Sequence, residues 1–197
     1  MALGFPFTPP CLTGFFALSA WCAMRRLALV ATTTPWGLRR AIEELGDALY
    51  PRDPGVIAEA DEGAGSTIYV LSILEPWVAF RLVVAEPPAY VKRLVPAEHV
   101  LMPGEDWVGE VVEAIVPRLG CEREVWIEVK PRGYFVADNE RTAAKRLAEA
   151  LRLRGVHARR RSRLVLKVED TRYGIAVALL EGRIDRISFW RERRLMG

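Results

Sequence analysis

The stretch from Val125 to Arg163 constrains the fold of this chain more than any other. It contains an alternating apolar segment, the tetrad Lys130-Pro131-Arg132-Gly133, an amphipathic pattern and the run Arg159-Arg160-Arg161-Ser162-Arg163. Alternation of apolar residues predicts a strand, and the three- and four-residue spacing that follows predicts a helix. A strand followed by a short turn and a helix is typical of α/β proteins.

Basic residues concentrate in the same stretch. Between Arg141 and Arg163, nine Arg or Lys oppose one acid, Glu149, so this window carries +8 while the whole chain carries +3. Such clustering, more than the overall charge, is the electrostatic mark of a nucleic-acid-binding module. A basic, solvated helix face is the alternative interpretation of a charge run.

Strand and helix patterns alternate on both sides of Met102-Pro103-Gly104. Before this turn, strands are predicted at 27–32, 56–60 and 67–74, helices at 35–45 and 77–85, and an extended segment at 91–101. After it, the order is a helix capped by Asp106, a strand at 125–130, a helix capped by Asp138 or Asn139, strands from Leu164 and Ile175, and a short last strand at 187–189. We therefore predict an α/β (α+β) protein with compact units at 24–104 and 105–197.

Residues 1–23 differ from the rest of the chain. They hold no charged side chain, and Arg25-Arg26 follow their apolar run, whereas a secretory signal has its basic residues ahead of it. The run is also shorter than the ~20 residues of a membrane-spanning helix. We expect an extension outside the core or a mis-assigned start, with Met24 as the true first residue, and no association with a membrane.

Motifs of catalysis are missing from the sequence. It has no phosphate loop, dinucleotide turn, HExxH or GxSxG, and only His99 and His157 offer an imidazole. Three widely spaced cysteines form no CxxC pair, so we expect no metal and no disulfide, and we predict a cytoplasmic location. From these absences we predict no catalytic residue and no cofactor, and we expect that the chain is not an enzyme.

Amide side chains, which read adenine edges, are almost absent, since the chain has one Asn and no Gln. Recognition would then depend on guanidinium contacts to phosphate and on shape, as expected for folded RNA. Of the aromatic residues Trp126, Tyr134 and Phe135, Trp126 is the better candidate for stacking on a base, because it shares a strand face with Lys130. Few amides and an excess of Arg over Lys also favour a thermophile, although high genomic GC content has a similar effect.

The candidate RNA-binding residues are all basic. They are Lys130, Arg132, Arg141, Lys145, Arg152, Arg154, Arg159, Arg160, Arg161 and Arg163, with Lys92 and Arg93 near the predicted junction of the two units. Arg152 and Arg154 also lie in the last turn of a predicted helix, where they would meet the negative end of its dipole.

The second half of the chain resembles a THUMP domain, an RNA-binding module of tRNA-modifying proteins. The resemblance rests on the order of its elements, on the strand Val125–Lys130 with Pro131-Arg132-Gly133, and on the helix ending at Arg154-Gly155. The segment Tyr90–Pro96 is similar to the one that joins an N-terminal ferredoxin-like domain to THUMP. One departure is the turn at 169–174, where the family usually has Asn-Pro.

The resemblance implies a ferredoxin-like domain followed by THUMP, an archaeal type of stand-alone protein, and binding to the acceptor region of tRNA. It further implies a non-catalytic adaptor for a separate enzyme, such as a cytidine N4-acetyltransferase. Two other hypotheses remain open at this point. In the first, the chain is a catalytic subunit of an RNA-modification enzyme. In the second, it is a basic module that binds an acidic protein partner.

Overall fold

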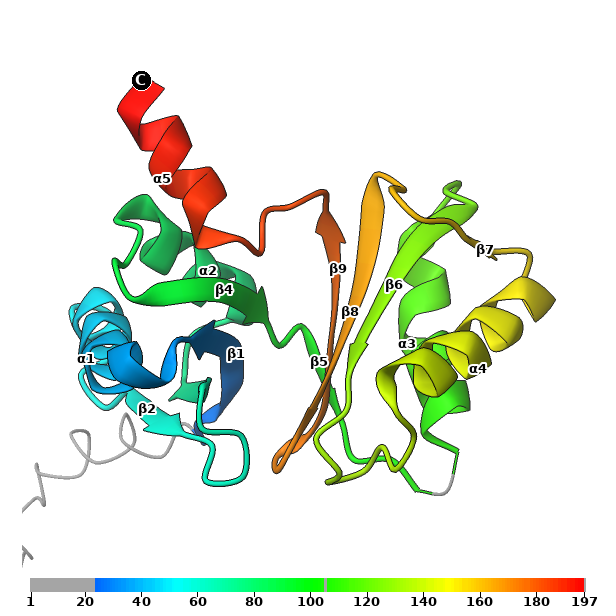
Figure 1. The fold of residues 1–197 in the computed structure, drawn as a ribbon, viewed down its shortest axis with the longest axis horizontal. Helices are drawn as coiled ribbons and strands as arrows, with labels where there is room; N and C mark the ends of the chain where they lie inside the picture. The colour runs from blue at the N-terminus through cyan, green and yellow to red at the C-terminus, as the bar shows by residue number, and fades with distance from the viewer. Residues whose placement is uncertain (1–23, 105, 197) are drawn as a thin grey trace, which may run out of the picture.

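The computed structural model describes residues 24–104 and 106–196, which form two β-sheets with helices on their outer faces (Figure 1). The predicted N-terminal extension, residues 1–23, lies outside the described residues. The predicted α+β class is confirmed.

The first sheet has four antiparallel strands in the order β2-β3-β1-β4. Its elements are β1 (Arg26–Thr33), the 3-10 turn η2 (Pro35–Gly37), α1 (Leu38–Leu49), β2 (Ile57–Ala60), β3 (Thr67–Ser72), α2 (Pro76–Ala85) and β4 (Val91–Pro96). The order βαββαβ is that of a ferredoxin-like domain.

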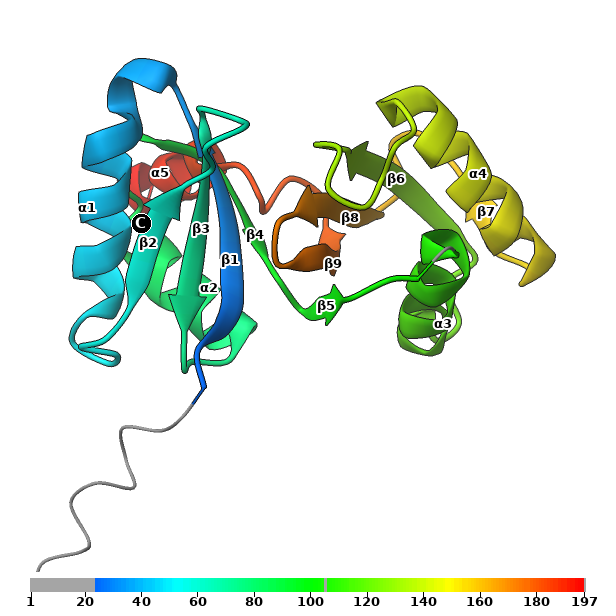
Figure 2. The same ribbon diagram turned by 90° about the horizontal axis from the view of Figure 1, so that it is seen from below.

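Helices α1 and α2 cover one face of this sheet (Figure 2). In α1, Ala41, Leu45 and Leu49 recur every four residues and are fully buried. This spacing places them on one side of the helix, so burial against the sheet stabilises α1.

The second sheet has the order β5-β9-β8-β6-β7. Its elements are β5 (His99–Leu101), α3 (Trp107–Leu119), β6 (Glu124–Lys130), α4 (Glu140–Leu153), β7 (His157–Ala158), β8 (Leu164–Thr171) and β9 (Gly174–Glu181). Strand β6 runs parallel to β7 and β8, and α3 and α4 cover the face that points away from the first sheet (Figure 1).

Local signals in the sequence set the ends of α3 and α4. The Asp106 carboxylate accepts a hydrogen bond from the Gly109 amide at 3.0 Å, and the Asn139 side chain accepts one from the Thr142 amide at 2.9 Å. Both bonds satisfy amides that have no partner within the helix. Gly155 follows α4 with φ of 74°, a conformation that glycine adopts without steric cost.

The chain crosses between the sheets twice, after β4 and after β9, and ends in α5 (Ile187–Met196) against the first sheet (Figure 1). The predicted short strand at 187–189 is wrong, because this segment is helical. Ile187 is fully buried in the core of the first sheet, and Trp190 packs against that core one turn later. The Trp190 indole also donates to the Ile184 carbonyl at 2.7 Å, and the two-residue apolar alternation gave no sign of this packing.

We call the first sheet with α1, α2 and α5 the first unit, and the second sheet with α3 and α4 the second unit. The inner faces of the two sheets meet through apolar residues, among them Leu27 and Val30 of β1 and Ala176 of β9. Strand β5 already belongs to the second sheet, upstream of the turn at 102–104. The division at residue 104 therefore stays a prediction about domains, while the sheets exchange segments on both sides of it.

Candidate nucleic-acid interface

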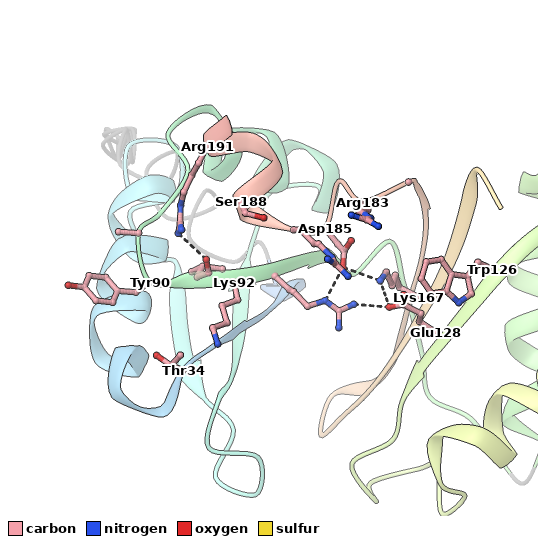
Figure 3. Close-up of a pocket in the computed structure, with 15 residues that line it drawn as sticks. Thr34, Tyr90, Lys92, Trp126, Glu128, Lys167, Arg183, Asp185, Ser188 and Arg191 are labelled. Atoms are coloured by element: carbon pink, nitrogen blue, oxygen red, sulfur yellow. Dashed lines mark hydrogen bonds and ion pairs between the residues drawn. The ribbon is translucent and has the colours of Figure 1, made fainter. Parts of the chain in front are cut away.

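Strand β6 divides its side chains between a core and an open surface. Val125 and Val129 are buried against α3 and α4, as the alternation predicted. Trp126 and Glu128 point the other way, toward the first unit (Figure 3). On this inner face, β9 packs on the first unit through small and apolar residues, so the polar face of β6 and β8 is left to line a cleft.

The cleft between the units has a volume of about 490 Å³. Tyr90, Lys92 and Arg93 line it from the first unit, Trp126 and Lys167 from the second, and the segment from Arg183 to Arg191 closes its upper side (Figure 3). A second hollow of about 340 Å³ adjoins it, because both are lined by Trp126, Gly182 and Arg183. Arg161 lines this second hollow, so the basic run after β7 reaches the mouth of the cleft.

Four charged side chains form a closed cluster across the floor of the cleft (Figure 3). The Arg93 guanidinium lies 3.0 Å from Glu128 and 2.9 Å from Asp185, and Lys167 contacts the same two carboxylates. Burial alone would lower the pKa of Arg93, but Asp185 and other nearby carboxylates raise it. The two cations are neutralised by the two acids, so this cluster adds no net charge to the cleft.

Other cations around the cleft have no acidic partner among the described residues. Within residues 24–104 and 106–196, the exposed side chains of Lys92, Arg161, Arg183 and Arg186 form no ion pair. Arg191 donates to the carbonyls of Pro88 and Val91, which are neutral acceptors. The cleft and the adjoining hollow are therefore lined by uncompensated cations and by Trp126, a combination that suits phosphates and unstacked bases.

Lys130 and Arg132 lie at the other end of β6, in or beside the β6–α4 loop, residues 131–139. The Arg132 side chain is 10% exposed, and its guanidinium lies 2.7 Å from the Glu169 carboxylate and 2.8 Å from the Asp170 carbonyl. Lys130 pairs with Glu140 at 2.8 Å. The seven-residue strand separates these residues from Glu124, the partner of Arg159, by about 20 Å.

Asp170 fixes the backbone of the loop that follows the basic tetrad. Its buried carboxylate accepts hydrogen bonds from the amides of Arg132, Tyr134, Phe135 and Val136, at 2.9 to 3.4 Å. Four amides that converge on one carboxylate fix the shape of the β6–α4 loop. Arg132 is thus a structural residue of this loop, and its guanidinium is largely withdrawn from solvent.

The remaining candidates lie on α4 and on the loop after β7, and all are exposed. Several pair with acids of the same unit: Lys145 with Glu149, Arg154 with Glu113, Arg159 with Glu124, and Arg163 with Glu181. Arg141, Arg152, Arg160 and Arg161 form no ion pair within the part of the chain that the structure describes. The predicted residues therefore do not form one site. They lie in the cleft and at its mouth, on the outer face of α4, and in or beside the β6–α4 loop.

The sequence reasoning missed Arg183, Arg186 and Arg191. A signal for them was present, since five arginines oppose two acids between Arg183 and Arg194. The basic cluster predicted from the sequence ends at Arg163 and does not include them. The local pattern of residues 183–194 does not show that this segment packs against the first unit and lines the cleft.

The described residues offer neither a membrane-spanning helix nor a cluster of metal ligands. No helix among them combines the length and apolar character needed to span a bilayer. No group of three potential metal ligands occurs in the described ranges either.

Comparison with known proteins shows a shared fold. No protein-family model and no curated protein matches the sequence. Among solved structures, TrmN from Thermus thermophilus matches with a TM-score of 0.57 and 24% identity, over 83% of this chain and 47% of TrmN. PH1313 from Pyrococcus horikoshii matches with a TM-score of 0.58 and 10% identity, over 80% of this chain and 56% of that protein. The shared fold is THUMP-like, and the chain spans about half the length of the proteins it matches.

The comparison corrects one prediction. The chain was expected not to be an enzyme, because it lacks catalytic motifs. TrmN is a tRNA methyltransferase of which this fold covers 47%, so the same arrangement occurs within a catalytic protein. The absence of catalytic motifs from these 197 residues therefore does not show that the protein is not an enzyme.

Proposed function

We propose that this chain binds structured RNA, and tRNA in particular, as the RNA-binding part of an RNA-modifying system. The observation that carries the proposal is the cleft with its adjoining hollow, which Lys92, Arg161, Arg183 and Arg186 line together with Trp126, without neutralising partners in the described ranges. Cations of this kind release counterions from the phosphate backbone when RNA binds. The THUMP-like fold supports RNA over an acidic protein as the ligand.

The candidate residues play different parts in this proposal. Lys92 and Arg161 contact phosphates at the two sides of the cleft, and Arg160, Arg152 and Arg141 extend the contact over the second unit. Arg93 and Arg132 act indirectly, because ion pairs occupy their guanidinium groups. The bound RNA is presented to a modifying centre, for which the resemblance predicts the acceptor region of tRNA as substrate and cytidine N4-acetylation as the reaction.

The test is a gel-shift titration of the purified protein with tRNA at increasing KCl concentrations. If the four cleft cations and Arg141, Arg152 and Arg160 each neutralise one phosphate, the logarithm of the association constant should fall with the logarithm of salt with a slope of about −5 to −6. A slope near zero would contradict binding through phosphates. Competition by poly-glutamate as effective as that by tRNA would instead favour an acidic protein partner.

A further inference from the structure

The two units touch through an apolar contact that does not by itself fix their relative orientation. Leu27, Val30 and Tyr69 of the first sheet pack against Ala176 of the second, and Val95 packs against Ala178 and Leu180. Apolar burial is non-directional, so it holds two faces together without selecting one angle between them. Directional contacts between the units must set that angle.

The Arg93 cluster is directional and lies at the floor of the cleft. Arg93 comes from β4 of the first unit, Glu128 and Lys167 come from β6 and β8 of the second, and Asp185 lies on the returning segment. The side chains of Lys167 and Asp185 are each 3% exposed, and they lie 3.0 Å apart. A guanidinium that reaches two carboxylates at once accepts only a narrow range of geometries.

A second polar contact joins the units at the far end of β8. The Tyr134 hydroxyl of the second unit donates to Asp61 of the first at 2.7 Å, and Arg172 and Tyr173 both contact Glu59 of the first unit. Lys167 and Arg172 are five residues apart along this strand and its turn, which corresponds to about 17 Å. Two polar contacts at this separation resist both twisting and opening of the units.

We infer that Glu128, bridging Arg93 and Lys167, is a positioning residue that sets the opening of the cleft for RNA. It does so although its own charge repels phosphate. The inference rests on the proposed function. If only net charge mattered, removing the negative charge of Glu128 would strengthen RNA binding, and the inference predicts the opposite. Removing the negative charge of Glu128 should weaken RNA binding, because the cleft loses its defined width.

Three variants separate the two views. Glu128→Gln adds one unit of positive charge and breaks the bridge. Arg93→Lys keeps the charge, but an ammonium lacks the planar fork that spans both carboxylates. Glu124→Gln is the matched control, because Glu124 lies on the same strand four residues earlier and, among the described residues, pairs only with Arg159 of its own unit.

The measurements are the affinity for tRNA and the distance between the units without RNA. For the distance, spin labels replace Arg39 of α1 and Lys145 of α4, which are 93% and 77% exposed, with the native cysteines changed to serine. Glu128→Gln and Arg93→Lys should each lower affinity about fivefold and broaden the distance distribution. Glu124→Gln should leave the distribution unchanged and should not lower affinity.

The inference would be overturned if Glu128→Gln bound RNA as tightly as the wild type or more tightly. Such a result would mean that affinity follows the net charge of the cleft. A broadened distribution with unchanged affinity would also overturn it. If Glu128→Gln does not fold, judged by its thermal unfolding, Arg93→Lys decides the outcome. Failure of the wild-type protein to bind tRNA is a separate result that refutes the proposed function, and the distance measurement then still decides whether the cluster fixes the units.

Discussion

The cleft and the β6–α4 loop both border β6, and they use basic residues in different ways. In the loop, the Arg132 guanidinium is engaged by Glu169 and Asp170 and is nearly buried. At the cleft, Arg183 and Arg186 are exposed and have no acidic partner in the described ranges. A basic residue therefore marks a ligand surface only where the fold leaves its charge uncompensated.

The largest effect should come from Arg132→Ala, and it should fall on stability. Removing one partner of a buried ion pair leaves Glu169 buried without its cation, at a cost of about 3 kcal/mol in the free energy of unfolding. Urea unfolding measures this cost. Folded Arg132→Ala protein should bind tRNA nearly as well as the wild type, and a large loss of affinity without a loss of stability would place Arg132 at the RNA.

A smaller but more specific effect is expected at the cleft. Arg183→Ala with Arg186→Ala should weaken tRNA binding about tenfold and reduce the steepness of the salt dependence by about 2, while the unfolding midpoint changes little. The matched control is Lys145→Ala with Arg154→Ala, which removes the same charge from exposed positions on α4 and at its C-terminal end, outside the cleft. Equal losses in the two double variants would show that the whole basic surface binds RNA without a preferred site.

The smallest effect concerns the pH dependence of the free energy of unfolding, to which Asp61, the hydrogen-bond partner of Tyr134 in the β6–α4 loop, contributes. Hydrogen bonds from Tyr134 and Tyr69 lower the pKa of Asp61, although burial of the carboxyl group opposes them. A lowered pKa stabilises the fold at pH values above about 4, and this contribution is lost as the pH falls through the pKa of the folded protein. Asp61→Asn should cost about 1 kcal/mol at pH 6, and the difference from wild type should shrink below pH 4. A difference that stays constant from pH 6 to pH 3 would contradict this assignment.

Local patterns predicted much of the fold. Alternation identified β6 and which of its residues are buried, and Asp106, Asn139 and Gly155 marked helix ends that the structure confirms. Helix α5 was missed, because its packing depends on a core built by residues more than ninety positions earlier.

The site was less predictable for a related reason. Whether Arg132 is available depends on Glu169 and Asp170, which are distant in sequence and become neighbours only when β8 pairs with β6. Charge counting also treats Arg93 and Lys92 alike, although the first is bound by two carboxylates and the second is exposed. Tertiary structure, and not the spacing of basic residues, determines which of them face a ligand.

Photo-crosslinking tests most directly whether RNA occupies the cleft. A tRNA that carries photoreactive uridines would be irradiated with the protein, and the crosslinked peptides identified by mass spectrometry. We predict crosslinks to Trp126 and to the segment from Arg183 to Arg191, with weaker ones at Arg160 and Arg161. Crosslinks confined to α4 and the β6–α4 loop would contradict the account.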